Sequence, residues 1–294
     1  MNLTDLQYAA GWRLVRLLPE RVAQAAFRLG ADLAVRRNGP GVRQLRANLG
    51  RLGAAHLVRE GMRSYARYWC ETFRLRAADG ARMVAATTVS NPAPFHEALD
   101  TGRGLIIALS HSGNWDAAGV WLIETLRRRG LDPVFTTVGQ RLRPESVYRR
   151  FVVHRVALGF DMVEEGAYRA LLRRLRGGGV VCVLADRDVL GASLDVTLLG
   201  EPARLPSGPA RLAARTGALL VPAFPSFTPD GWAATLGEPI PVPEPGRRDD
   251  VAKATQALAD ALTALIATAP HDWHMLQRVW TADLRDRDLQ DRAR

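Results

Sequence analysis

The sequence contains little cysteine and almost no lysine, and both shortages narrow what the protein can do. Of its 294 residues only Cys70 and Cys182 are cysteines. Cys182 lies in the apolar run VVCVLA, which favours a buried free thiol over a disulfide or a metal ligand. This usage suits a reducing cytoplasm. Lys253 is the only lysine, so arginine carries almost all of the positive charge.

Long apolar runs and targeting signals are also missing. No stretch of about 20 apolar residues continues without an arginine, which excludes a transmembrane helix. The N-terminus lacks the basic, apolar and small-residue order of a signal peptide. We therefore expect a protein that is soluble or that lies on a membrane without crossing it.

The signatures of several enzyme classes do not occur. There is no GxxxxGK[ST], GxGxxG or GxSxG motif, which argues against P-loop, Rossmann and nucleophile-elbow enzymes. His271 and His274 have a spacing that can bind a metal, but no cysteine or second histidine pair joins them. We therefore expect no metal. Neither cysteine lies in a polar, electropositive setting, which disfavours a cysteine nucleophile.

Apolar residues and net positive charge are both plentiful. Hydrophobic residues make up 47% of the chain, which excludes a disordered protein. The length suits one large α/β domain or two small ones. The formal net charge of +10 favours an anionic partner, namely a phosphate-bearing substrate, an anionic lipid surface or a nucleic acid.

From Val84 onward, short apolar runs alternate with helical patterns. The predicted strands are Leu105–Ser110, Pro133–Val138, Asp161–Glu164, Val180–Asp186, Leu194–Leu199 and Ala218–Phe224. The predicted helices are 116–129, 144–157, 166–176, 206–216 and 250–268. This alternation predicts an α/β fold with a central, mostly parallel sheet flanked by helices on both faces.

The N-terminal part has a helical pattern instead. One apolar face of the first 35 or so residues contains Leu3, Leu6, Ala10, Leu14 and Leu17. Such a basic amphipathic helix either lies in a bilayer interface or packs on the domain, and the sequence leaves both open. More helix is expected over 42–78. We predict a helical, membrane-facing region over 1–80 and an α/β core over 81–294 within one domain.

The stretch LIIALSHSGNWDAAG joins a predicted strand to a predicted helix. His111 and Asp116 can meet only if the chain turns between them, and Ser112, Gly113 and Asn114 are suitable turn and N-cap residues. His111 is then at the carboxyl end of a strand, where open α/β sheets bind ligands.

This placement suits a general base. A helix N-terminus favours neutral imidazole, and a nearby carboxylate can orient the ring and stabilise the imidazolium formed later. A buried histidine beside a helix cap is the structural alternative for an HxxxxD pattern.

A set of motifs in register carries a resemblance to a known family. HSGNWDAAG resembles the HxxxxD motif of the glycerolipid and lipid A acyltransferase superfamily. It is followed in order by RLRPESVYRRFVVHRVALGF, GGGVVCVLADRD, LLGEPARLPSGPARLAARTGALLVPAF and PHDWHMLQRVW. Together they cover roughly 105–280, and they are most similar to the actinobacterial phosphatidylinositol mannoside acyltransferase branch.

The resemblance implies a glycerolipid-acyltransferase-like fold and transfer of a long acyl group, for which we expect palmitoyl, to a mannose hydroxyl of a phosphatidylinositol mannoside. It implies acyl-CoA as co-substrate and no cofactor. His111 would remove the hydroxyl proton. Asp186 resembles the family's acidic residue near that histidine and would form a relay, with Asp116 as support or acceptor contact. Spacing does not decide which carboxylate pairs with His111.

Arginines complete the implied site. Arg149, Arg150 and Arg155 match the basic second motif and would bind phosphates of CoA or phosphoinositol, although each also fits a solvated helix face. Arg187 would contact substrate or pair with its acidic neighbours. The implied location is the cytoplasmic face of the plasma membrane, peripherally on an anionic surface, without nucleic acid. Chain length, a carrier-protein donor and the acylated hydroxyl stay open.

Two other functions remain open at this stage. One is acylation of another glycolipid or a lysophospholipid, as in lipid A synthesis. The other is a non-catalytic basic module that docks on anionic lipid or nucleic acid, which explains the charge but not the His111–Asp116 arrangement.

Overall fold

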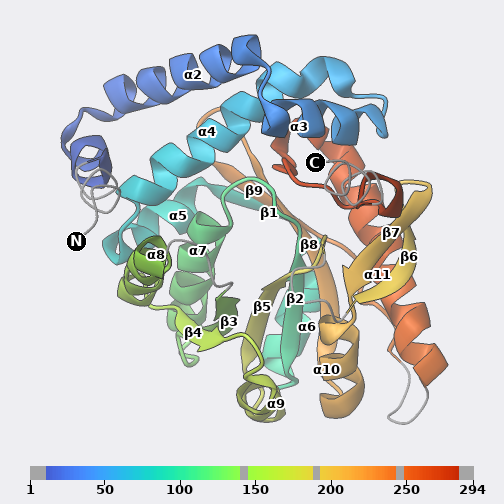
Figure 1. Ribbon diagram of the computed structural model, residues 1–294. Helices are drawn as coiled ribbons and strands as arrows, with labels where there is room; N and C mark the ends of the chain where they lie inside the picture. The colour runs from blue at the N-terminus through green and yellow to red at the C-terminus, as the bar shows by residue number, and fades with distance from the viewer. Residues whose placement is uncertain (1–10, 140–144, 188–192, 243–247, 285–294) are drawn as a thin grey trace.

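The computed structural model describes residues 11–139, 145–187, 193–242 and 248–284, and a seven-stranded sheet crosses its middle (Figure 1). The strand order is β1-β9-β8-β2-β5-β3-β4. The strands are β1 Thr87–Ser90, β2 Leu105–Leu109, β3 Phe135–Gly139, β4 Asp161–Glu164, β5 Val180–Leu184, β8 Leu219–Phe227 and β9 Trp232–Leu236. From β8 to β4 all neighbours are parallel, while β9 is antiparallel to β8 and parallel to β1. The predicted α/β fold with a mostly parallel sheet is confirmed.

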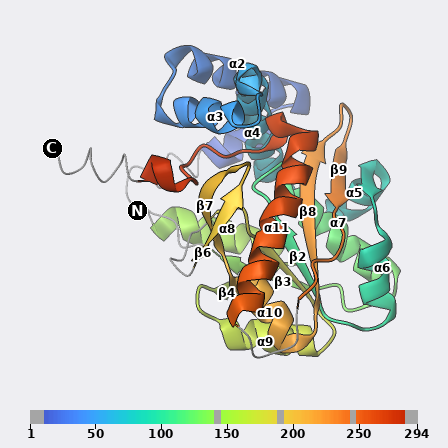
Figure 2. The same ribbon diagram turned by 90° about the vertical axis from the view of Figure 1, so that its right-hand side faces the viewer.

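Helices cover both faces of this sheet, which is why its central strands are apolar along their whole length. On one face lie α5 Gly80–Ala86, α6 Ala93–Asp100 and α7 Trp115–Arg128, and on the other α9 Tyr168–Arg176, α10 Gly208–Thr216 and α11 Arg248–Thr268 (Figure 2). Along β2, Leu105 and Ile107 pack toward α7, whereas Ile106 and Ala108 pack toward α10 and α11. The helix α8 spans Glu145–Ala157.

The N-terminal part is helical over 11–17, in α2 Glu20–Arg37, in α3 Pro40–Gly50 and in α4 Val58–Arg74. The helix expected over 42–78 is found in two parts, α3 and α4, because Gly53 with a φ of 68° and a 3-10 turn at Ala55–Leu57 separate them. Leu3, Leu6 and Ala10 lie outside the described residues. Among the residues that the structure describes, no helix combines the length and apolarity needed to cross a bilayer.

One predicted strand belongs to a different sheet. The predicted Leu194–Leu199 is found as β6 Ser193–Leu198, which pairs antiparallel with β7 Glu201–Pro206 in a separate two-stranded sheet. The turn between them places Leu199 and Gly200 at φ values of 52° and 80°, the geometry of a tight hairpin. The strands β1, β7 and β9 were not predicted.

The segment after α11 is tied to α3 by a buried amide. The side chain of Asn48 is fully buried, and its Nδ2 donates to the carbonyl oxygens of Met275 at 2.7 Å and Gln277 at 2.9 Å. These carbonyls belong to the segment that also reaches the carboxyl end of the sheet. The N-terminal helices and the C-terminal segment are therefore one structural unit.

We expect Asn48→Ala to lower the free energy of unfolding by about 2–3 kcal/mol, because it removes two hydrogen bonds and leaves buried carbonyls without a donor. Urea denaturation measures the loss. Gln256→Ala is the matched control, because its exposed amide also joins distant elements, at Thr197. It should cost less than about 1 kcal/mol. Equal losses in both variants would contradict this account.

Candidate active site

A tight turn joins β2 to α7 and brings His111 to the carboxyl edge of the sheet. Asn114 caps the helix, with its Oδ1 accepting from the Ala117 N–H at 3.0 Å. Gly113 has a φ of 50°, and a Cβ there would lie 2.6 Å from the Pro225 carbonyl carbon. Only glycine fits that turn without displacing β8.

His111 pairs with Asp186, which follows β5. The His111 Nδ1 lies 2.5 Å from Asp186 Oδ1, and the His111 backbone N–H donates to Oδ2 at 2.8 Å. Trp273 Nε1 also donates to Oδ2 at 2.8 Å. The Asp186 side chain is 0% exposed, and that of His111 is 15% exposed.

These contacts determine the ionisation of Asp186 and the tautomer of His111. Burial by itself would raise the pKa of Asp186, but the His111 ring and the hydrogen bonds from His111 and Trp273 bring that pKa below its ordinary value. An ionised carboxylate only accepts hydrogen bonds, so the His111 Nδ1 carries a proton. The lone pair of a neutral His111 ring is then on Nε2.

Asp116 points elsewhere. Its carboxylate accepts from Arg155 Nε at 2.8 Å, from the Tyr68 hydroxyl at 3.2 Å and from Thr72 Oγ1 at 3.4 Å. Although burial would lower the pKa of Arg155, the Asp116 charge raises it above its ordinary value. Asp116 thus joins α7 to α4 and α8. Of the two carboxylates that spacing left open, Asp186 is the one at the His111 ring.

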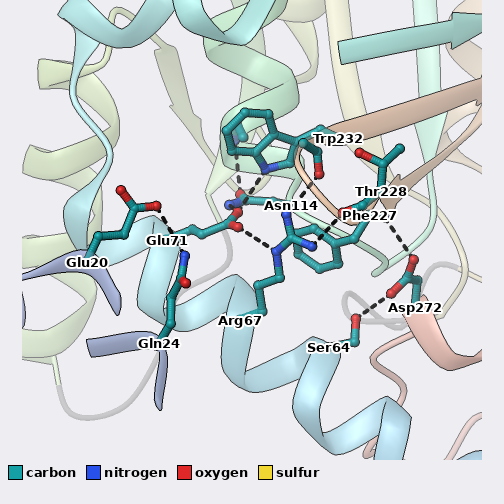
Figure 3. Close-up of polar contacts among 12 residues, drawn as sticks. Glu20, Gln24, Ser64, Arg67, Glu71, Asn114, Phe227, Thr228, Trp232 and Asp272 are labelled. Atoms are coloured by element: carbon teal, nitrogen blue, oxygen red, sulfur yellow. Dashed lines mark hydrogen bonds and ion pairs between the residues drawn. The ribbon is translucent and has the colours of Figure 1, made fainter. Parts of the chain in front are cut away.

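Glu71 on α4 gathers hydrogen bonds at the start of α7. Its Oε2 accepts from Asn114 Nδ2 and from Trp232 Nε1, both at 2.8 Å, and its Oε1 accepts from Arg67 Nε at 2.7 Å (Figure 3). Arg67 in turn donates to the Thr228 carbonyl at 2.8 Å. Glu71 therefore fixes the helix cap against the β8–β9 turn, a role with no motif in the sequence.

A second buried group on α4 holds the C-terminal segment. Ser64 Oγ lies 2.6 Å from Asp272 Oδ1, and Asp272 Oδ2 accepts from the Phe227 N–H at 2.8 Å (Figure 3). Ser64 Oγ also lies 2.8 Å from Nε2 of His274, whose pKa burial lowers to about 3. His274 is therefore a neutral structural residue. In the described part of the chain no three His, Cys, Asp or Glu side chains are grouped to hold a metal.

An apolar pocket of about 370 Å³ opens beside His111. It runs between α7 and the sheet, and Trp115 and Trp121 are in its wall. The Trp115 and His111 rings are in edge contact, with centroids 5.8 Å apart. Cys182 is a buried thiol in the same wall.

The predicted arginines lie in different surroundings. Arg155 lines the pocket and is paired with Asp116. Arg149 is on the solvent side of α8, with Nε 3.4 Å from Glu145. Arg150 is partly buried, and Arg187 is half-buried directly after Asp186. Residues 140–144 and Asp188, which belong to the same motifs, are outside the described residues.

Comparison with known proteins identifies the family. A family model described as bacterial lipid A biosynthesis acyltransferase matches residues 2–282. The chain belongs to this family. It is similar to a protein of Mycolicibacterium smegmatis named phosphatidylinositol mannoside acyltransferase, with 45% identity over 97% of this chain and 94% of that protein. A protein of the same name from Mycobacterium tuberculosis is 42% identical over 99% of this chain and 93% of its own length.

Among solved structures, the chain resembles the 1-acyl-sn-glycerophosphate (LPA) acyltransferase PlsC from Thermotoga maritima. Their identity is 12%, with 83% of this chain and 97% of that chain covered and a TM-score of 0.37. The family and its curated relatives confirm the resemblance drawn from the motifs. The protein is an acyltransferase.

The Asp186 contacts predict a pH dependence of stability. A folded-state pKa below the unfolded value of about 3.9 stabilises the protein above that pH, and this contribution is lost as the pH falls. Between about pH 6 and pH 3, urea denaturation should give a steeper loss for wild type than for Asp186→Asn. Asp230→Asn, in an exposed turn, should keep the wild-type slope. Parallel curves for wild type and Asp186→Asn would contradict the assignment.

Proposed function

We propose that the protein transfers a long acyl group from acyl-CoA to a mannose hydroxyl of a phosphatidylinositol mannoside, with His111 as general base. The observation that carries this proposal is the His111–Asp186 pair at the mouth of an apolar pocket. The two mycobacterial relatives, named for the same acceptor, support its identity.

The chemistry follows from the proton on Nδ1. The acceptor hydroxyl oxygen attacks the thioester carbonyl carbon while His111 Nε2 takes the hydroxyl proton. The resulting imidazolium is stabilised by the buried Asp186 carboxylate at 2.5 Å. As the carbon–sulfur bond breaks, the thiolate receives that proton from Nε2. The products are the acylated glycolipid and the free thiol of CoA, and the histidine returns to its starting state.

The pocket and the arginines suit the two substrates. The apolar wall between α7 and the sheet matches an alkyl chain, which burial removes from water. We propose that Arg187, which follows Asp186 in the chain, contacts a phosphate of CoA or of phosphoinositol. Arg155 of α8 shapes the pocket wall through its pair with Asp116, and Arg149 and Arg150 are on the same helix.

Replacing the base tests the reaction. With palmitoyl-CoA and phosphatidylinositol mannoside, His111→Ala should lower the rate of thiol release by about 10²- to 10⁴-fold, because the acceptor proton loses its base. The variant should stay folded at the assay temperature, as circular dichroism measures, but its thermal midpoint should fall because the buried Asp186 loses the donor at His111 Nδ1. Asp116→Asn is the comparison variant. It should weaken the contact between position 116 and Arg155, and it leaves the proposed base, His111, in place.

The acceptor is tested in the same assay. Thiol release by wild type that depends on phosphatidylinositol mannoside supports the proposal. Release that depends instead on a lysophospholipid or a lipid A precursor would move the protein to another acceptor class. Equal rates for wild type and His111→Ala would show that His111 is not the base.

We propose further that the N-terminal region lies on an anionic membrane surface. Several large apolar side chains on it are exposed: Leu14, Leu17, Val22, Leu29 and Leu33, of which Leu17 is 82% exposed. Exposed arginines are interleaved with them: Arg13, Arg21, Arg28, Arg36 and Arg37. Exposed leucines beside exposed arginines are the pattern of a helix that binds a lipid interface. Nearby α8 exposes Val153 and Val156.

Vesicle flotation tests this placement. Wild type should float with vesicles of phosphatidylcholine and phosphatidylinositol, and the double variant Leu14→Glu, Leu17→Glu should stay in the soluble fraction, because charge at these positions opposes burial in the interface. Leu131→Glu is the matched control, at a leucine 38% exposed after the far end of α7. If the control loses binding equally, or the double variant still floats, the surface is wrongly assigned.

A further inference from the structure

The pocket beside His111 reaches both faces of the sheet, because two neighbouring strands separate. Strands β3 and β5 are in register from Phe135 with Val180 to Thr137 with Cys182. Beyond that point Val138 pairs with Val163 of β4, and Val183 pairs with Ala108 of β2. The pocket lining includes residues on both sides of this separation. One part of the pocket is therefore under α7, and another reaches α9 and α10.

The two parts differ in polarity. The part under α7 is lined mainly by apolar side chains and glycine, among them Ile107, Gly119, Leu122, Phe135, Phe160 and Cys182, and the Asp116–Arg155 ion pair also lines the pocket. The part toward α9 and α10 includes the polar groups of Glu164, Tyr168, Ser207 and Arg211. An alkyl chain gains most by leaving water for the first part. The second part suits the polar portion of a donor.

Two aromatic rings and a glycine close the α7 part at its β3 side. Phe135 and Phe160 are buried, with ring centroids 4.7 Å apart. A Cβ at Gly119 would lie 2.4 Å from Phe160 Cζ and 3.0 Å from Phe135 Cζ. Glycine is unfavourable inside a helix, so its presence here reflects the close approach of these rings. On the opposite side, formed by β8 and β9, the wall contains Ala223, Ala234 and Leu236.

We propose that Gly119 and Phe160 set the longest acyl chain that the protein accepts. The inference rests on the proposed function, because it assigns the α7 part of the pocket to the acyl group of the donor. The chain passes from the thioester at His111 beneath α7 toward β3 and stops at the two rings. A side chain larger than hydrogen at position 119 pushes the Phe160 ring into the pocket, since the surrounding core is close-packed.

A series of saturated acyl-CoA donors tests the assignment. The measured quantity is kcat/KM for decanoyl-, lauroyl-, myristoyl-, palmitoyl- and stearoyl-CoA with one fixed acceptor. Gly119→Ala should lower the value for palmitoyl-CoA by about tenfold or more relative to that for decanoyl-CoA. Phe160→Leu should shift the preference the other way, toward stearoyl-CoA. Gly80→Ala is the matched control, because its Cβ would meet Glu124 on the outer face of α7.

The outcomes separate this inference from the proposed function. If wild type releases thiol from none of the donors, the proposed donor is wrong. If wild type is active and both variants keep its chain-length profile, the Gly119–Phe160 assignment is overturned. A profile shortened by Ala234→Leu but unchanged by Gly119→Ala would also overturn it, because the chain would then end under β9. Should Gly119→Ala fail to fold, the shift in Phe160→Leu decides.

Discussion

The buried carboxylate of Asp186 is the group on which the site depends. A charge removed from water is costly unless donors replace its hydration, and here the donors are the His111 ring, the His111 backbone N–H and Trp273 Nε1. They belong to the end of β2 and to the C-terminal segment, while Asp186 follows β5. One carboxylate thus holds three separate parts of the chain at the same point and sets the His111 tautomer at that point.

The C-terminal segment supports the same edge with its backbone. The His274 N–H donates to the His111 carbonyl at 2.7 Å, and the Gly113 N–H donates to the Asp272 carbonyl at 2.9 Å. Asp272 and His274 are held in turn by Ser64 on α4, and the cap of α7 is held by Glu71, about two turns further along the same helix. The N-terminal helices are therefore part of the scaffold of the site, in addition to any role at a membrane.

Local pattern was enough to predict β2, the turn and α7, because strand apolarity, Gly113 and the Asn114 cap are all signals within a few residues. Asp186 could be proposed as the partner of His111 only from the resemblance to the family motif. The choice between Asp186 and Asp116 depends on which side chains each carboxylate contacts in the folded chain, and sequence spacing does not determine those contacts. Glu71 and Ser64 act over separations of 43 and 208 residues and have no local signal. The short edge strand β1, with its half-polar TTVS sequence, resembles a loop.

The helix α7 links the base to the pocket through its own periodicity. Trp115, Ala118, Gly119 and Leu122 follow the three-and-four spacing of one helix face, and all of them line the pocket. Asp116, Val120 and Ile123 form a second stripe with the same spacing, offset by one residue from the first. Asp116 is buried in its ion pair with Arg155, and Val120 and Ile123 are buried in the core. The pocket lies under the stripe that contains Ala118 and Gly119. The second stripe, with Val120 and Ile123, packs into the hydrophobic core. A helix that must both cap the histidine turn and leave room for a substrate therefore has its smallest pocket residues, Ala118 and Gly119, within its first two turns.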